Sequence, residues 1–284
     1  MVEITDIEVL REHVRTERVA GRRIALVPTM GSLHEGHLTL ADVARQHGDV
    51  VVMTLFVNPL QFAPGEDFDR YPRDIESDRA LAATRGVDVL FAPSVEEMYG
   101  AGRELRITGA GAANRWEGAV RPGHFDGVLT LVAKLFNIVR PDVACFGQKD
   151  IQQVTLVRRM IRELEFPIEF VVVPTVREAD GLAMSSRNVY LSAIERQSAT
   201  ALSASLREAD AAWRAGATDP AVLRHLIEEV LSGRAPGAPL VADYIAIVDA
   251  LDMAPVTRVV PGTIVALAVR VGKTRLIDNI ILGA

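Results

Sequence analysis

The first 175 residues alternate between short apolar runs and longer segments in which apolar residues recur every three or four positions. The short runs have the length of buried strands, and the periodic segments have that of amphipathic helices. The predicted strands are residues 24–27, 50–56, 87–91, 143–146 and 168–173. The predicted helices are residues 38–45, 77–84, 128–139 and 151–164. This alternation predicts an α/β fold with a doubly wound, Rossmann-like, mostly parallel sheet.

The pattern changes after Thr175. Residues 194–215 and 220–231 are predicted helices, the second opened by Asp219 as N-cap and Pro220 at the first helical position. Strand-like runs follow a loop and cover residues 244–248, 263–271 and 275–282, with a hairpin turn at Gly272-Lys273. We therefore predict a Rossmann-like domain over residues 1–175 and a smaller C-terminal α+β domain over residues 176–284. The Gly- and Ala-rich stretch 100–122 supports no assignment.

Composition narrows the class of protein. The chain has 284 residues, 49% of them hydrophobic, and a net charge of −6 without a basic stripe, so we expect no nucleic-acid partner. Its single cysteine excludes an intramolecular disulfide framework and suits a reducing compartment. The first residues do not have the pattern of a secretory leader, and no apolar run approaches the length of a membrane span. We expect a cytoplasmic protein with no membrane partner.

The segment Pro28-Thr29-Met30-Gly31-Ser32-Leu33-His34-Glu35-Gly36-His37 is the most specific signal in the chain. It places two histidines in the first turn of a helix that follows a buried strand, where an α/β sheet opens its ligand crevice and helix amides can bind phosphate. The pattern His-x-Gly-His resembles the nucleotide-binding motif of nucleotidyltransferases and class I tRNA synthetases. Two other interpretations are a metal pair and incidental surface histidines. The spacing is one residue short of the zinc motif His-Glu-x-x-His, and no second cluster supplies a third ligand.

Two neutral amides, Asn58 and Gln61, follow the second predicted strand and could hydrogen-bond a hydroxyl or a carboxylate. An Asn-Pro turn with a polar loop residue explains them equally well. The next segment, residues 63–73, is polar and contains Gly and two prolines, so it is either a lid over a site or a plain surface loop. The stretch 121–128 leads into another predicted helix and needs no functional explanation.

Cationic and hydroxyl side chains follow later strands. Lys149 comes directly after the strand 143–146 and suits a phosphate, and Gln153 lies four residues on, on the same helical face. Ser185, Ser186 and Arg187 combine two hydroxyls with a guanidinium, which suits a polyphosphate. Each group also has an ordinary explanation, a solvated Lys-Asp pair in the first case and a common loop sequence in the second.

These motifs occur in order, and together they resemble the pantothenate synthetase (pantoate–β-alanine ligase) family over nearly the whole chain. The resemblance rests on these segments: Pro28-Thr29-Met30-Gly31, His34-Glu35-Gly36-His37, Phe56-Val57-Asn58-Pro59, Gln61-Phe62, Tyr71-Pro72-Arg73, Gly147, Lys149-Asp150, Gln153, Met184-Ser185-Ser186-Arg187-Asn188 and Thr274-Arg275-Leu276-Ile277-Asp278-Asn279. Gln148 departs from the family, which more often has Glu there, and its place beside Lys149 suggests a tuning change. The Ser-Ser-Arg loop lacks the lysines of the analogous synthetase loop, as is normal for pantothenate synthetases.

The resemblance implies an ATP-dependent, AMP-forming ligase that joins pantoate to β-alanine through pantoyl adenylate. It implies ATP and Mg²⁺ as requirements, a homodimer, a first domain that binds nucleotide and pantoate, and a C-terminal domain that acts as a lid. The catalytic residues it implies are His37, Lys149, Ser185, Ser186 and Arg187. The ATP-binding residues it implies are Met30, His34, Gly36, His37, Gly147, Lys149, Asp150, Val176, Met184, Ser185, Ser186 and Arg187. The pantoate-binding residues it implies are Pro28, Thr29, Met30, Asn58, Gln61 and Gln153, and Asp78 is the candidate metal contact. Cys145 is expected in the core.

Two rival functions remain open from the sequence. Another nucleotidyltransferase on the same scaffold should carry extra cationic residues where this chain has the neutral Gln61 and Gln153. A non-catalytic ATP-binding module should have lost one of the phosphate-contacting residues, yet His34, His37, Lys149 and Ser185–Arg187 are all present.

Overall fold

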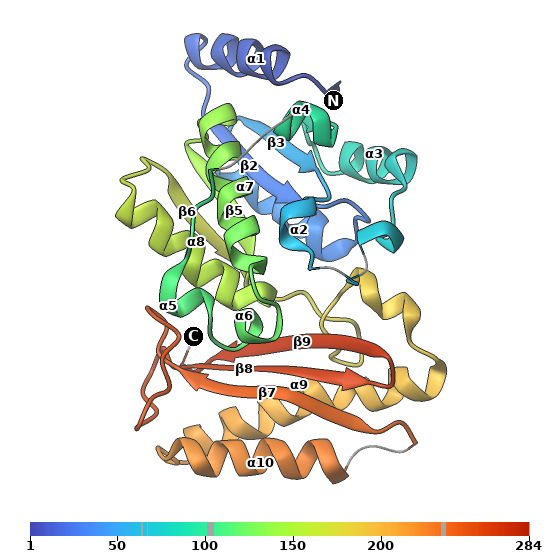
Figure 1. The fold of residues 1–284 in the computed structure, drawn as a ribbon, viewed down its shortest axis with the longest axis vertical. Helices are drawn as coiled ribbons and strands as arrows, with labels where there is room; N and C mark the ends of the chain where they lie inside the picture. The colour runs from blue at the N-terminus through green and yellow to red at the C-terminus, as the bar shows by residue number, and fades with distance from the viewer. Residues whose placement is uncertain (64, 67, 101–104, 234–236, 284) are drawn as a thin grey trace.

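A six-stranded parallel sheet forms the centre of the first part of the molecule (Figure 1). The structure is a computed structural model, which describes residues 1–63, 65–66, 68–100, 105–233 and 237–283. The strands are β1 (Val2–Ile4), β2 (Ile24–Thr29), β3 (Val50–Leu55), β4 (Val89–Phe91), β5 (Val143–Gly147) and β6 (Glu169–Val173). They lie in the order β1-β4-β3-β2-β5-β6, and every neighbouring pair is parallel. The predicted doubly wound sheet is confirmed.

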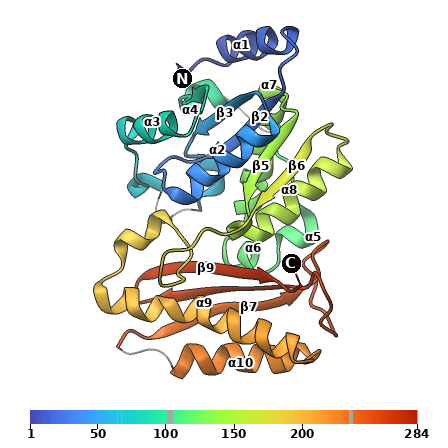
Figure 2. The ribbon, with the colours of Figure 1, turned by 180° about the vertical axis from the view of Figure 1, so that it is seen from behind.

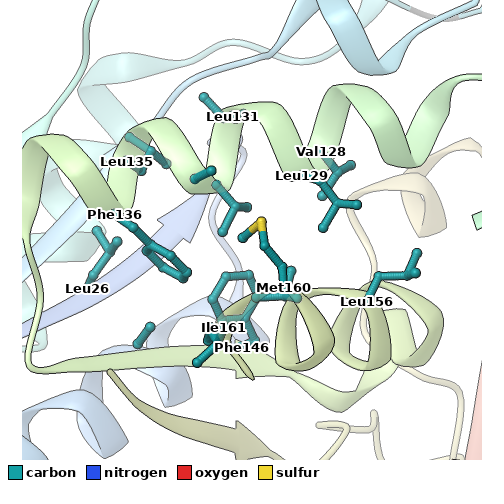
Figure 3. Packing of buried hydrophobic residues seen from close by; sticks show 14 of the residues in the cluster. Leu26, Val128, Leu129, Leu131, Leu135, Phe136, Phe146, Leu156, Met160 and Ile161 are labelled. Carbon is teal, nitrogen blue, oxygen red and sulfur yellow. The ribbon is translucent and has the colours of Figure 1, made fainter. Parts of the chain in front are cut away.

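Helices cover both faces of this sheet because both faces of its strands are apolar. The helices are α1 (Ile7–Val19), α2 (Glu35–His47), α3 (Ile75–Thr84), α4 (Val95–Tyr99), α5 (Ala110–Ala113), α6 (Glu117–Val120), α7 (His124–Val139) and α8 (Ile151–Glu163). Along β2, Ile24 and Leu26 face the cluster formed with α7 and α8, whereas Ala25 and Val27 face the cluster formed with α2. Figure 3 shows Phe136 and Met160 of the first cluster packing between α7 and α8.

A three-stranded antiparallel sheet follows, with strands β7 (Leu240–Val248), β8 (Ile264–Val271) and β9 (Thr274–Ile281). The helices α9 (Ala193–Arg214) and α10 (Pro220–Gly233) cover one of its faces, as both views show (Figures 1 and 2). Along β7 and β8, the residues that pack against these helices alternate with residues, such as Ala246 and Ala266, that pack into the core of the first part. The two parts therefore share buried contacts, although the domain boundary near Thr175 stays an interpretation of the sequence.

The predicted elements agree with the observed ones to within a few residues, and the differences lie in short elements. Asp219 accepts a hydrogen bond from the backbone of Ala221 at 2.8 Å, as its predicted capping role requires. The hairpin between β8 and β9 turns at Gly272, where φ is +58°. The prediction omitted β1, α1 and α4, and it left residues 100–122 unassigned, a stretch in which α5 and α6 lie. Within the part of the chain that the structure describes, no helix is long and apolar enough to cross a membrane.

The order of the strands fixes the place of the crevice. From β2 the chain moves outward through β3 and β4, and it then returns to the other side of β2 with β5. The connections that leave β2 and β5 therefore diverge, which opens a crevice at the carboxyl ends of these two strands. The His34–His37 turn follows β2 and Lys149 follows β5, so the topology brings these two motifs to one edge.

Candidate active site

The turn between β2 and α2 is held in a left-handed conformation that presents the histidines. Gly31 has φ of +82° and Ser32 has φ of +53°, so two successive residues lie in the region that only glycine occupies freely. Asp78 in α3 stabilises this turn, because its carboxylate accepts hydrogen bonds from the backbone of Ser32 at 2.8 Å and of Leu33 at 2.7 Å. Thr29 joins the ends of β2 and β3 through Thr54.

Asp78 therefore has a structural role in this turn, and its expected contact with a metal ion stays a prediction. It is 4% exposed, and each of its oxygens is already bonded to a backbone amide. A Cβ atom at Gly31 would lie 2.8 Å from this carboxylate, so the turn and Asp78 fit closely together. The geometry favours a role for Asp78 in positioning the His34 turn rather than a role as a ligand of an ion.

The two imidazoles of the motif lie side by side, with ring centroids 4.1 Å apart. His34 is the N-cap of α2, and its Nδ1 accepts a hydrogen bond from the backbone of Gly36 at 3.1 Å. Its proton is therefore on Nε2, which leaves an N–H donor on the other side of the ring. Burial, followed by the charge of Lys149, lowers the pKa of His34 from 6.5 to about 4. Burial, followed by His34 and Lys149, lowers the pKa of His37 to about 3.

Gly36 has a packing reason that the sequence did not reveal. A Cβ atom there would lie 2.9 Å from Cε1 and 3.0 Å from Nδ1 of His34, and 3.9 Å from Cβ of Met184. The ring of the capping histidine therefore packs directly on Gly36, and a larger residue there would displace it. The same distances show that the segment carrying Met184, far along the chain, packs against the start of α2.

Neutral amides gather behind Met30, but they differ in exposure. Gln61 donates through Nε2 to Sδ of Met30 at 2.9 Å, and its Oε1 accepts from Asn58 at 3.3 Å. Asn58 is completely buried and also bonds Gly127, Leu60 and Tyr99. Asn58 therefore supports Gln61 from behind, and its amide has no room for a ligand of its own. Met30 also lines a small cavity of about 300 Å³.

Lys149 lies in a short 3-10 turn between β5 and α8, beside a large cavity. The turn covers Gln148–Asp150, and Gly147 before it has open space where a Cβ would stand. Among the residues that the structure describes, no hydrogen-bonding or ion-pairing partner of the Lys149 ammonium is found. Its charge contributes to the lowered pKa values of His34 and His37, so these three groups lie within electrostatic range. The Lys149 ammonium is therefore available to an anion in the crevice.

The Ser-Ser-Arg segment lies at the end of a small loop that returns on itself. The backbone of Met184 donates to the carbonyl of Val176 at 3.0 Å, and the Ser185 hydroxyl accepts from the backbone of Arg187 at 3.2 Å. A 3-10 helix over Ser186–Tyr190 follows. Asn188 bonds Glu178 and the Ala183 carbonyl, which fixes the loop to itself.

The large cavity has a volume of about 850 Å³ and lies between the carboxyl end of the first sheet and the C-terminal sheet. The site residues predicted from the sequence that line it are Lys149, Asp150, Gln153, Ser185 and Arg187. The structure thus brings the later motifs into one cavity. His34, His37 and Gln61 are not among the described residues that line it.

The cavity also contains an ion-pair network that sequence reasoning missed. The carboxylate of Glu117 in α6 accepts hydrogen bonds from both terminal guanidinium nitrogens of Arg275 in β9, at 2.8 and 2.7 Å. Arg275 also bonds Asp243, and Arg121 pairs with Glu66 on the other side of Glu117. His124 donates through Nδ1 to the Gln61 carbonyl at 2.8 Å, since a carbonyl can only accept. The sequence segments 121–128 and 274–279 contain Arg121 and Arg275 of this network, although nothing in these segments identifies the partners of the two arginines.

Fold and site together define the class of Rossmann-like α/β proteins with a phosphate-suited crevice at the switch point of the sheet. Comparisons with known proteins then identify the family. The sequence profile of the pantoate-beta-alanine ligase family matches residues 3–281, so the chain belongs to the pantoate–β-alanine ligase family. This family consists of ligases, and the chain is an enzyme of that class.

Relatives match over almost their whole length. The pantothenate synthetase of Moorella thermoacetica is 52% identical over 276 residues, which cover 97% of this chain and 96% of the relative. The crystal structure of pantothenate synthetase from Thermus thermophilus is 48% identical, with a TM-score of 0.92 and 99% of each chain covered. The pantoate-beta-alanine ligase of Francisella tularensis, solved in complex with beta-gamma ATP and beta-alanine, is 34% identical with a TM-score of 0.80, and the match covers 99% of this chain and 97% of that one.

Proposed function

We propose that this enzyme condenses pantoate with β-alanine to pantothenate through a pantoyl-adenylate intermediate, and that it releases pyrophosphate and AMP. The observation that carries the proposal is the cavity of about 850 Å³. It is lined by Lys149, which has no protein partner in the described chain, and by Arg187, Ser185 and the neutral Gln153. Cations and hydroxyls suit phosphates, and the neutral amide suits a small hydroxy acid. Membership of the family and the ligands of the Francisella relative support the same assignment.

In the first step a carboxylate oxygen of pantoate attacks the α-phosphorus of ATP. The new P–O bond forms as the bond to the pyrophosphate oxygen breaks, so negative charge builds on the phosphate oxygens. Fixed donors at these oxygens should contribute most to catalysis. Lys149, Ser185, Ser186 and Arg187 are the donors we propose, and Gly147, Asp150 and Val176 supply the surrounding backbone.

His34 and His37 are proposed as neutral donors to the nucleotide phosphates. An imidazole with a pKa of about 4 or 3 is uncharged at neutral pH, so it can donate a hydrogen bond without carrying a charge. For His34 the donating atom is Nε2, because Nδ1 is already engaged with Gly36. For His37, Nδ1 is buried without a partner among the described residues. Met184 closes this side of the site, since it packs against Gly36.

Pantoate is proposed to bind between Gln61 and Gln153, with Met30 over the reacting groups. Pro28, Thr29 and Asn58 would act from behind, because Thr29 and Asn58 are buried and bonded within the protein. A site of neutral amides fits a substrate with hydroxyls and one carboxylate, whereas extra cations would favour a phosphorylated substrate.

In the second step the amine of β-alanine attacks the carbonyl carbon of the adenylate, and AMP leaves with the electrons of the broken C–O bond. No nucleophilic side chain is required. Cys145 fits this expectation, since burial, followed by Glu169, raises the pKa of its thiol to about 12. The thiol is therefore protonated and inert at neutral pH.

Mg²⁺ and the homodimer remain proposals drawn from the family. The described residues contain no group of three His, Cys, Asp or Glu side chains that could hold a metal ion, and both oxygens of Asp78 are bonded to the backbone. This donor set does not fit a dedicated protein site for Mg²⁺. An ion of this kind is commonly held by substrate phosphates.

The test is exchange of labelled pyrophosphate into ATP, which reports the first step alone. Exchange should require pantoate and should not require β-alanine, and addition of β-alanine should then yield AMP. Lys149→Ala should reduce exchange by roughly 3–4 kcal/mol of lost transition-state stabilisation, which is several hundred-fold. Exchange without pantoate would favour another nucleotidyltransferase, and ATP binding without exchange would favour a non-catalytic module. Near wild-type exchange in Lys149→Ala would remove this lysine from the mechanism.

A further inference from the structure

One buried side chain of the C-terminal sheet contacts the turn that carries Lys149. Asn279 lies near the end of β9 and is 1% exposed. Its Nδ2 donates to the carbonyl of Gln148 at 3.0 Å and to the carbonyl of Lys149 at 2.9 Å. The proposed role of Lys149 does not account for these two bonds, which join residues 130 or more positions apart in the sequence.

The two carbonyls have a particular relation to Lys149. One belongs to the peptide unit before its Cα atom, and the other belongs to the peptide unit after it. Each peptide unit is planar, so holding both carbonyls restrains φ and ψ of Lys149 and hence the direction of its Cβ. No side chain caps either this turn or the start of α8, since Gly147 has none and Asp150 makes no capping bond. Asn279 supplies the restraint that a local cap would otherwise give.

The carboxamide of Asn279 is itself held in one orientation. Its Oδ1 accepts from Nε2 of Gln148 at 3.2 Å, so a flip of the amide would exchange three favourable contacts for repulsive ones. Its backbone donates to Asp278 at 2.7 Å, and Asp278 receives both guanidinium nitrogens of Arg177 at 2.6 and 2.9 Å. Pairing of Asn279 with Ala266 in β8 completes the support.

We propose that Asn279 is a positioning residue, which aims the ammonium of Lys149 at the reacting phosphate, with Gln148 orienting its amide. The phosphate-binding lysine of the first sheet is then aligned by the second sheet. Gln148 thereby has a function in orienting Asn279. The inference rests on the proposed phosphate contact of Lys149.

The experiment is a double-mutant cycle between Asn279→Ala and Lys149→Ala, measured as pantoate-dependent pyrophosphate exchange by the purified full chain. Misplacement of a catalytic group costs on the order of 10- to 100-fold in kcat, so Asn279→Ala should lose that much while KM for pantoate stays within about twofold. In the Lys149→Ala background the same substitution should cost less than about threefold, because its target is gone. Gln148→Ala should show the same dependence with a smaller loss, and it keeps the test available should Asn279→Ala not fold.

Gln152 offers a matched control for the loss of a buried amide. It is 4% exposed, and its Nε2 donates to the carbonyls of Ala112 at 2.8 Å and Arg115 at 2.9 Å, with no bond to the Lys149 turn. Gln152→Ala should lower thermal stability, and any loss of exchange should be the same factor with and without Lys149. Equal losses for Asn279→Ala in both backgrounds would overturn the positioning role and leave Asn279 structural. If Lys149→Ala alone exchanged normally, the proposed role of Lys149 would fail, and this inference with it.

Discussion

The buried imidazole of His37 should make the folded protein sensitive to mild acid. Its pKa is about 3 in the folded state against 6.5 ordinarily. The unfolded chain takes up a proton at this residue below pH 6.5, and the native state does not until about pH 3, so the stability contribution is present at neutral pH and is lost as the pH falls. At pH 5, about 1.5 units below the ordinary pKa of 6.5, protonation of His37 in the unfolded chain lowers the free energy of unfolding. At 1.36 kcal/mol for each unit, the loss is about 2 kcal/mol.

Urea unfolding at pH 7.5 and pH 5.0 measures this loss, with His37→Gln as the comparison. The substitution itself changes the free energy of unfolding equally at both pH values. This change cancels because, for each protein, we compare the free energy of unfolding at pH 7.5 with that at pH 5.0. The free energy of unfolding of the wild type should fall by about 2 kcal/mol more than that of the variant between the two pH values. The contribution of His34 is the same in both proteins, because with folded-state pKa values of about 4 and about 3 both imidazoles are still mainly neutral at pH 5.

The opposite outcome is equally clear. Parallel pH dependence in the wild type and His37→Gln would mean that His37 binds its proton alike in the folded and unfolded states. The imidazole would then be charged in part near pH 6.5, and its proposed use as a neutral donor to phosphate would lose its basis.

Three further variants test the site. Gln153→Ala should weaken pantoate binding by roughly 1–2 kcal/mol and ATP binding much less, since it deletes a neutral amide partner of the hydroxy acid; equal losses in a calorimetric titration would count against the assignment. Glu117→Gln should lower the free energy of unfolding by about 3 kcal/mol, because it leaves Arg275 without its bidentate partner at a largely buried position, and a urea titration that finds less than about 1 kcal/mol would argue that the pair is solvated. Gly36→Ala should cost about 1–3 kcal/mol in stability and displace the ring of His34, so thermal unfolding and nucleotide titration should both change, and unaltered binding would show that this ring does not contact the nucleotide.

The layers of the fold were predictable because most of its elements bury long apolar segments. The buried strand β3 and the helix α7, with eleven buried residues, leave a strong local pattern. The missed elements lack such a pattern. β1 has three residues and buries only Ile4, and α6 has four residues and begins after Trp116 with a φ of +46°. Short elements of this kind are defined by the surfaces they contact, which a single sequence does not contain.

The candidate site was predictable at the level of motifs and unpredictable at the level of partners. Lys149, Gln153 and Arg187 were chosen from local patterns, and they line one cavity. The resemblance to the family implies a metal contact at Asp78, which stays a prediction, whereas the bonds of its carboxylate to the turn before α2 have no signal in the local sequence. The bond between Glu117 and Arg275 joins residues 158 positions apart, and no local pattern pairs one arginine with one carboxylate over that distance.

Strand β9 explains why two sheets are needed for one site. Arg275, Asp278 and Asn279 lie within five residues of each other, and they contact three separate parts of the chain: Glu117 in α6, Arg177 after the last strand of the first sheet, and the turn of Lys149. The Rossmann-like part alone would still contain Lys149, but it would lack the bonds from Asn279 that we propose to fix the direction of this side chain. It would also leave the ion pair of Glu117 unmade on the cavity wall. The boundary near Thr175 stays an interpretation of the sequence, and the unit that we propose to align a phosphate includes both sheets.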